Sequence, residues 1–126
     1  SGESMNRLLI VDDSLVMRSR IARLCASGAV GGIEIAGQAA NGLEAIEVAR
    51  RITPDCVTMD LTMPEMDGEA CIAELAGLLP EARILVVSAL SDKATALRAI
   101  KKGAHGFVHK PFSDAQLAAA LKELMQ

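Results

Sequence analysis

Polar residues with useful chemistry stand where four apolar runs of the sequence end. They are Asp12 and Asp13, Asp60, Ser88 followed by Ala89, and Lys110 followed by Pro111. Three carboxylates that converge at one place repel each other and need a cation if all are to stay ionised. Mg²⁺ is a hard ion that commonly takes one or two carboxylates together with waters and a phosphate. The set therefore favours the handling of a phosphoryl group at a magnesium site.

The residue types also predict individual roles. Asp60 is the best nucleophile, because it is the lone carboxylate on the strand expected in the centre of the sheet, and a carboxylate can form an aspartyl phosphate. Lys110 adds a mobile positive charge, and the Ser88 hydroxyl can donate to an anionic oxygen. Each aspartate also has an ordinary alternative: Asp12 or Asp13 could cap a helix, and Asp60 could be a turn residue. The coincidence of four such run ends is what indicates function.

The elements that must position these residues alternate between two periodicities. Short apolar runs predict strands at residues 8–11, 33–36, 56–59, 84–87 and 106–108, and three of these runs are nearly continuous, as is typical of buried parallel strands. Between them, apolar residues recur at helical spacing, namely Leu15, Ile21 and Leu24; Leu43, Ile46 and Ala49; Ile72, Leu75 and Leu79; Leu97 and Ile100; and Leu117, Leu121 and Leu124. The order predicts an α/β domain with a doubly wound (βα)5, flavodoxin-like fold: a five-stranded parallel sheet with helices on both faces.

Punctuating residues agree with these limits. Asp67 can cap the third helix, Ser113 to Gln116 fit a capping box for the fifth, and Gly103 can end the fourth. Residues 5–126 are expected to form the domain. The four residues before Met5 look like a cloning remnant and are expected to lie outside the fold.

Composition excludes several functions. The 126 residues favour one domain, and 51% hydrophobic with 23% charged residues indicates a globular chain. Two aromatic residues and a formal charge of −3 argue against a nucleic-acid partner, and no apolar segment reaches the roughly 18 residues of a membrane span. Cys25, Cys56 and Cys71 are odd in number and lie in apolar surroundings, so we expect buried thiols and a cytoplasmic protein.

Four phrases of the sequence carry a resemblance to a known family. They are "LLIVDDS", "PDCVTMDLTMPEMDG", "ILVVSAL" and "GAHGFVHKPF", and they stand in the family's order and at its usual separations. The chain resembles the receiver domain of two-component response regulators, the CheY-like superfamily, over residues 7–125. The Ser88-Ala89 pair looks most like chemotaxis-type receivers.

The resemblance implies a role for each site residue. Asp60 is the implied phosphoacceptor, and Asp13 and Asp60 are implied to ligate Mg²⁺ directly. The main-chain carbonyl of Thr62 is the implied third protein ligand, whereas Asp12 acts mainly through a coordinated water. Lys110 is implied to pair with the phosphoryl oxygens.

A second group of residues is implied to transmit the modification. Ser88 moves inward to bond to the phosphoryl group, and Ala89 is small enough to leave that group room. The ring of Phe107, where many members of the family have Tyr, fills the vacated space in a change of packing alone. Pro111 is the candidate cis-proline that aims Lys110 into the site. The surface that changes is implied to comprise the fourth helix, the last strand and the last helix.

The implied function is that of a phosphorelay receiver. A sensor histidine kinase or phosphotransfer protein donates the phosphoryl group, and a downstream target protein or a fused output domain reads the result. The domain catalyses only its own phosphorylation and dephosphorylation, as a monomer or as a phosphorylation-dependent dimer. Neither His105 nor His109 is expected to bind metal, because both should face solvent, and the Lys101-Lys102 pair is either a solvated helix end or a partner contact.

Three alternatives remain on the sequence. A haloacid-dehalogenase-like phosphatase needs a second carboxylate two residues after the nucleophile, where this chain has Thr62, and usually a cap domain. A nucleotide-binding domain of the flavodoxin or Rossmann kind needs a glycine-rich first turn, where this chain has Asp12, Asp13 and Ser14. The third alternative is a receiver fold that serves as a phosphorylation-independent protein-binding module; the complete set of site residues argues against it, although a complete site can go unused.

Overall fold

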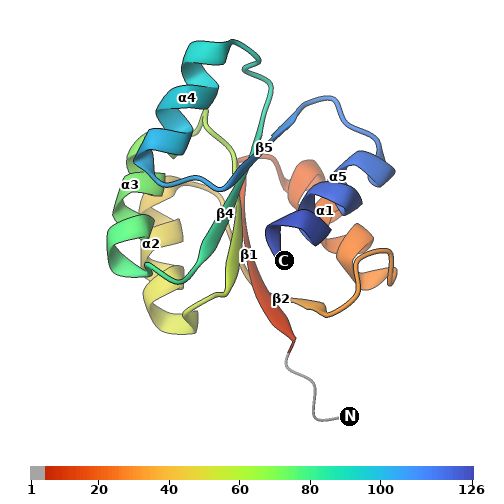
Figure 1. The fold of residues 1–126 in the computed structure, drawn as a ribbon. Helices are drawn as coiled ribbons and strands as arrows, with labels where there is room; N and C mark the ends of the chain where they lie inside the picture. The colour runs from red at the N-terminus through yellow and green to blue at the C-terminus, as the bar shows by residue number, and fades with distance from the viewer. Residues whose placement is uncertain (1–4) are drawn as a thin grey trace.

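Strands and helices alternate along the whole of the described chain, residues 5–126 of a computed structural model (Figure 1). The elements are β1 (Asn6–Val11), α1 (Leu15–Ala26), β2 (Ile33–Ala39), α2 (Gly42–Ile52), β3 (Cys56–Met59), α3 (Gly68–Leu78), β4 (Arg83–Ser88), α4 (Lys93–Lys102), β5 (Gly106–His109) and α5 (Asp114–Leu124). The strands form one parallel sheet in the order β2-β1-β3-β4-β5. The doubly wound (βα)5 fold is therefore confirmed, whereas the expected remnant at residues 1–4 lies outside the described chain.

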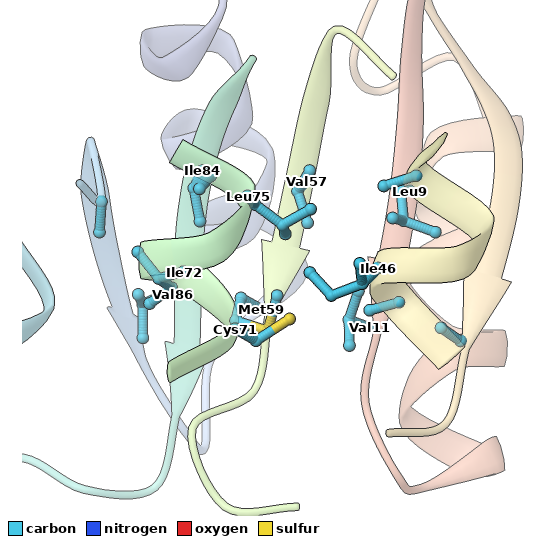
Figure 2. Close-up of a cluster of buried hydrophobic side chains, with 14 of the residues drawn as sticks. Leu9, Val11, Ile46, Val57, Met59, Cys71, Ile72, Leu75, Ile84 and Val86 are labelled. Carbon is cyan, nitrogen blue, oxygen red and sulfur yellow. The ribbon is translucent and has the colours of Figure 1, made fainter. Parts of the chain in front are cut away.

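Helices cover both faces of the sheet, with α2, α3 and α4 on one face and α1 and α5 on the other (Figure 1). Alternate residues of the strands point to opposite faces, so Leu9 and Val11 pack under α2 and α3 while Leu8 and Ile10 pack under α1 and α5. Figure 2 shows the first of these layers, in which Ile46 of α2 and Leu75 of α3 lie over the side chains of the sheet. Burial on both faces explains why the central strands are continuously apolar.

The three cysteines are buried, as expected. Burial raises the pKa of the Cys25 thiol to about 11 and that of the Cys56 and Cys71 thiols to about 12. The thiols are therefore protonated at neutral pH and pack as small apolar groups. Among the helices of residues 5–126, none has the length and apolar character needed to cross a bilayer.

Several helical positions expected in the core face solvent instead. Leu15 is 64% exposed and Leu97 is 59% exposed, and Leu43 and Ile100 are exposed as well. Leu15 is the first residue of α1 and directly follows the cap Ser14. In α4 the residues that are buried are the small Thr95 and Ala99, so the leucine and isoleucine of the expected stripe point away from the sheet.

The second strand runs three residues beyond its expected end. Its register against β1 shifts between Leu8 and Leu9, which pair with Ile35 and Gly37, and the strand continues to Ala39 after this irregularity. The position of Gly37 is tight, because a Cβ there would lie 3.1 Å from side-chain atoms of Ile52 and Val48 in α2. The end of the apolar run therefore marked the bulge and not the end of the strand.

Most of the predicted helix boundaries are confirmed. Asp67 caps α3, Ser113 and Gln116 form the capping box of α5, and Gly103 ends α4 with a φ of 126°. Ser14 caps α1 by accepting from the Met17 amide at 3.2 Å. Neither Asp12 nor Asp13 is the cap, so the ordinary alternative for this pair does not apply.

Candidate functional site

Backbone hydrogen bonds extend the sheet past the ends of its strands and hold the site residues at its carboxyl edge. The Asp12 amide donates to the Ala39 carbonyl at 3.1 Å, and the Asp60 amide donates to the Val11 carbonyl at 3.0 Å. On the other side, the Lys110 amide donates to the Ser88 carbonyl at 2.8 Å. The sheet therefore brings residues from β1, β3, β4 and β5 to one edge, as the order of the elements predicted.

The three carboxylates expected at this edge do come together. Asp12, Asp13 and Asp60 each offer one oxygen, and these oxygens lie within 4.8 Å of one another. Asp12 and Asp60 are buried, whereas Asp13 is exposed. Oxygen donors in this arrangement fit a hard divalent cation such as Mg²⁺, which binds through one or two carboxylates and keeps several waters.

The protonation of Asp60 reflects this crowding. Burial is the main cause that raises the pKa of Asp60 to about 6, and the negative charges of Asp12 and, less strongly, Asp13 act in the same direction. The Lys110 ammonium and a hydrogen bond from the Thr62 amide lower it. A group of carboxylates in which one member is this basic gains from a nearby cation, which supports the metal assignment on physical grounds.

Lys110 lies between the carboxylates. Its Nζ donates to Asp12 Oδ2 at 2.8 Å and lies 3.7 Å from Asp60 Oδ1. The Lys110–Pro111 peptide bond is cis, which confirms the expectation for Pro111. Lys110 is therefore within reach of a group bonded to Asp60, although it is paired with Asp12 in this structure.

Asp12 is fixed from three sides. Its Oδ1 accepts from the Ser14 amide at 2.9 Å, and its Oδ2 accepts from Lys110. Its backbone carbonyl accepts from Arg18 Nη1 at 2.8 Å. The role of Arg18 escaped the sequence analysis, because a single arginine about one turn into a helix looks like any solvated residue.

The loop after Asp60 is shaped by a close backbone approach. The Gly68 amide donates to the Leu61 carbonyl at 3.0 Å, and a Cβ at Gly68 would lie 2.3 Å from the Asp60 carbonyl oxygen. Only glycine fits there, so Gly68 sets how the chain leaves the nucleophile's strand. Thr62, the third expected metal ligand, is exposed, and its amide lies 3.5 Å from Asp60 Oδ1.

The β4 side of the edge is arranged differently. Ser88 is buried, and its hydroxyl accepts from the Leu90 amide at 3.0 Å, while Ala89 beside it is exposed. Phe107 of β5 pairs in register with Val86 and is half-buried against the core under α2 and α3. Ser88 and Phe107 are thus on neighbouring strands, as the expected switch requires.

Both histidines face solvent, as expected, but each also bonds to the backbone. His105 Nδ1 accepts from the Ile84 amide at 3.0 Å, and His109 Nε2 lies 3.1 Å from the Ala89 carbonyl oxygen. Neither belongs to the cluster of Asp12, Asp13 and Asp60, and the two rings bond to separate backbone groups. The bond to Ala89 is a contact that the sequence alone did not suggest.

Comparison with known proteins finds relatives over nearly the whole chain. Residues 8–122 match the family model described as the response regulator receiver domain. The chemotaxis protein CheY of Thermotoga maritima is 42% identical over 118 residues, which cover 94% of this chain and 96% of that protein.

Solved structures agree with the sequence relatives. A crystal structure of the CheX–CheY–BeF3–Mg²⁺ complex from Borrelia burgdorferi contains a chain that superposes with a TM-score of 0.89 at 30% identity, covering 95% of this chain and 89% of that one. The response regulator domain of Thermotoga maritima CheB superposes with a TM-score of 0.82 at 31% identity, covering 96% and 92% respectively. This chain therefore shares its fold with both proteins.

Proposed function

The chain belongs to the response regulator receiver domain family, and from that premise we propose that Asp60 accepts a phosphoryl group from a phosphohistidine. The donor would be a sensor histidine kinase or a phosphotransfer protein. The observation that carries this proposal is the position of Asp60, a buried carboxylate at the tip of the central strand with Lys110 Nζ 3.7 Å from its Oδ1.

The transfer is an in-line displacement at phosphorus. An Asp60 carboxylate oxygen forms the new bond to phosphorus while the bond from phosphorus to the donor's imidazole nitrogen breaks, and that nitrogen keeps the electron pair. Water later attacks the same phosphorus, which releases inorganic phosphate and restores the Asp60 carboxylate. The domain would thus catalyse its own modification and its reversal without turning over a separate substrate.

The residues around Asp60 divide the remaining work. Asp13, Asp60 and the Thr62 carbonyl would hold Mg²⁺, with Asp12 contributing through a water, and the bound ion would offset charge on the phosphoryl oxygens. Lys110 would donate to the same oxygens, since its ammonium already lies between Asp12 and Asp60.

The response would pass through β4 and β5. The Ser88 hydroxyl would turn from the Leu90 amide to a phosphoryl oxygen, and Ala89 carries no bulk that would obstruct that group. The half-buried Phe107 ring would then occupy the vacated space. The exposed Leu97 and Ile100 give α4 an apolar face that a downstream target or a fused output domain would contact.

The relatives support partner binding of this kind. The Borrelia burgdorferi neighbour was crystallised as a complex of CheY with CheX. By analogy, this chain would act on a protein partner in the cytoplasm, as a monomer or a phosphorylation-dependent dimer, with a chemotaxis-type role favoured by the CheY relatives.

Intact-protein mass spectrometry tests the proposal. Wild type is incubated with acetyl phosphate with and without Mg²⁺, alongside Asp60→Asn and the control Asp114→Asn, which changes an exposed aspartate on α5. We expect a Mg²⁺-dependent gain of one phosphoryl group in wild type and in the control, and none in Asp60→Asn. A gain that persists in Asp60→Asn would refute this assignment, and no gain in any protein would leave a phosphorylation-independent binding module as the better function.

A further inference from the structure

We propose that His109 is a positioning residue that holds the β4–α4 loop, residues 89–92, in its resting form and opposes its rearrangement when Asp60 is phosphorylated. His109 is the last residue of β5 and pairs in register with Ser88 of β4. Its Nε2 lies 3.1 Å from the Ala89 carbonyl oxygen. Because a carbonyl oxygen only accepts, Nε2 must carry the hydrogen and donate it. The inference rests on the proposed function, because it concerns the response to phosphorylation.

Two side chains grip a single peptide group in this loop. The Ala89 carbonyl accepts from His109, and the Leu90 amide donates to the Ser88 hydroxyl at 3.0 Å. This carbonyl and this amide are the two polar groups of one planar peptide unit. The plane is therefore held at both ends, and it cannot rotate without breaking both bonds.

Few other bonds restrain this part of the chain. Within residues 5–126, the bonds from Ser88 and His109 are the two hydrogen bonds that join residues 89–91 to the rest of the chain. All three of these loop residues are exposed. The next fixed point is Asp92, whose side chain caps α4 by accepting from the Thr95 amide at 3.0 Å. The peptide between Ala89 and Leu90 therefore decides where the loop lies.

Phosphorylation would act on Ser88 and His109 in opposite ways: Ser88 would release the loop, whereas His109 would keep it in the resting form. When the Ser88 hydroxyl turns to the phosphoryl group it releases the Leu90 amide, and the loop can then rearrange only if the hydrogen bond from His109 to the Ala89 carbonyl breaks as well. A bond made in the resting form and lost in the activated form favours the resting form by the whole of its strength. His109 therefore raises the free energy of activation, and its removal should make the activated form easier to reach.

Replacing His109 by two amides provides a matched test. The amide nitrogen of His109→Gln can reach about as far as Nε2, whereas that of His109→Asn stops near the position of Nδ1 and cannot reach the carbonyl. The side chain is exposed, so both variants should fold. His105→Asn serves as the control, because it removes an exposed histidine of the same region that bonds to the Ile84 amide instead.

The first measurement needs no phosphoryl group. Hydrogen exchange of the Leu90 amide, followed by NMR, should be about 3- to 10-fold faster in His109→Asn, the range that one net hydrogen bond contributes. His109→Gln and His105→Asn should exchange as wild type does. Equal exchange in all four proteins would show that His109 does not hold the loop.

The second measurement tests the coupling. In the presence of Mg²⁺, BeF3⁻ should bind about 3- to 10-fold more tightly to His109→Asn than to wild type, and His109→Gln should bind as wild type does. A His109 that only stabilised the fold would change the melting temperature without changing this affinity. If wild type binds BeF3⁻ and the variants match it, the coupling is refuted while the proposed function stands. If wild type does not bind BeF3⁻ at all, the proposed function and the coupling are both refuted.

Discussion

The two halves of the carboxyl edge are built in contrasting ways. At the ends of β1 and β3, Asp12 and Asp60 are buried, and their amides continue the sheet through bonds to the neighbouring strands. Beyond the end of β4, Ala89 and Leu90 are exposed. Each is held by one hydrogen bond to a side chain, Ala89 to His109 and Leu90 to Ser88. The half at β1 and β3, which carries the carboxylates, is thus fixed by backbone hydrogen bonds. The half at β4, which is expected to respond, is held by side-chain hydrogen bonds that a change of rotamer can break.

The contrast extends to the helices that follow. α3, which begins after the carboxylate loop, buries four residues, namely Gly68, Cys71, Ile72 and Leu75. α4, which begins after the β4–α4 loop, buries only Thr95 and Ala99. Because apolar burial is the main source of stability for a helix in a protein, α4 can shift at less cost than α3. A fixed chemical half and a loosely packed responsive half suit a site whose modification must be read at a distance.

Gly68→Ala should break the fixed half, with the largest effect on stability. Its Cβ would lie 2.3 Å from the Asp60 carbonyl oxygen and 2.5 Å from Leu61 Cα, and backbone atoms cannot yield as a flexible side chain can. We expect a loss of about 3 kcal/mol in the free energy of unfolding, measured by urea denaturation.

Gly77→Ala is the matched control in the same helix. Nothing lies within 4 Å of the Cβ position there, so alanine should raise the stability by up to about 1 kcal/mol through its helix propensity. If the two substitutions had equal effects, the close approach at Gly68 would not restrain the loop.

Asp60→Asn should remove the free-energy cost of keeping Asp60 ionised in its buried position beside Asp12 and Asp13. Because the pKa of Asp60 is raised from 3.8 to about 6, the folded protein binds more protons than the unfolded chain between these values, and its stability falls as the pH rises through that window. In EDTA, we expect Asp60→Asn to exceed wild type by about 2 kcal/mol above pH 7 and to match it near pH 4. Denaturation curves at both pH values check this, and a difference that did not change with pH would contradict the electrostatic cause.

Mg²⁺ should offset part of the same cost. A ligand that binds only the folded state stabilises it by about 1.4 kcal/mol at ten times its dissociation constant, so wild type should gain about this much in the free energy of unfolding as Mg²⁺ is added. Asp13→Asn should lose most of the gain, because Asp13 is part of the carboxylate cluster. Glu123→Gln, which neutralises an exposed carboxylate on α5, should keep it. An equal gain in all three proteins would place the ion elsewhere.

The fixed half is also the part that sequence reasoning described best. The bounds of β3 agree with the apolar run, and the carboxylates lie where buried strands end, because a strand covered on both faces must be apolar throughout. The caps at Asp67 and Ser113 were equally predictable, since an aspartate or serine cap acts on an amide only a few residues away. Both signals are local in the chain.

Contacts between distant residues were not predictable in this way. The bond from His109 to Ala89 and the space available at Gly68 depend on which strands and loops become neighbours. The prediction that Leu97 lies in the core was wrong for a related reason. Helical spacing identifies an apolar stripe, but it does not tell whether that stripe packs against the sheet. The less regular half of the edge is therefore where the structure adds most to the sequence.

The smallest expected effects come from deleting the hydroxyl of Thr58 in β3 or that of Ser88 in β4. Thr58 of β3 is 1% exposed, and its Oγ1 is the one buried side-chain polar atom in residues 5–126 that has no hydrogen-bond partner. Thr58→Val should therefore raise the free energy of unfolding by about 1 kcal/mol, since it removes an unsatisfied group from between Ile10 and Leu85. Ser88→Ala removes a hydroxyl that does have a partner, and it should lower that free energy by about 0.5 to 1 kcal/mol.

These two hydroxyls separate stability from loop restraint. Leu90 amide exchange should become faster in Ser88→Ala and stay unchanged in Thr58→Val, because only Ser88 holds the peptide group between Ala89 and Leu90. Urea denaturation and exchange measured on the same samples give both results. If Ser88→Ala lost stability without faster exchange at Leu90, the β4–α4 loop would be held by more than its two side-chain bonds, and the contrast between the halves of the edge would have to be abandoned.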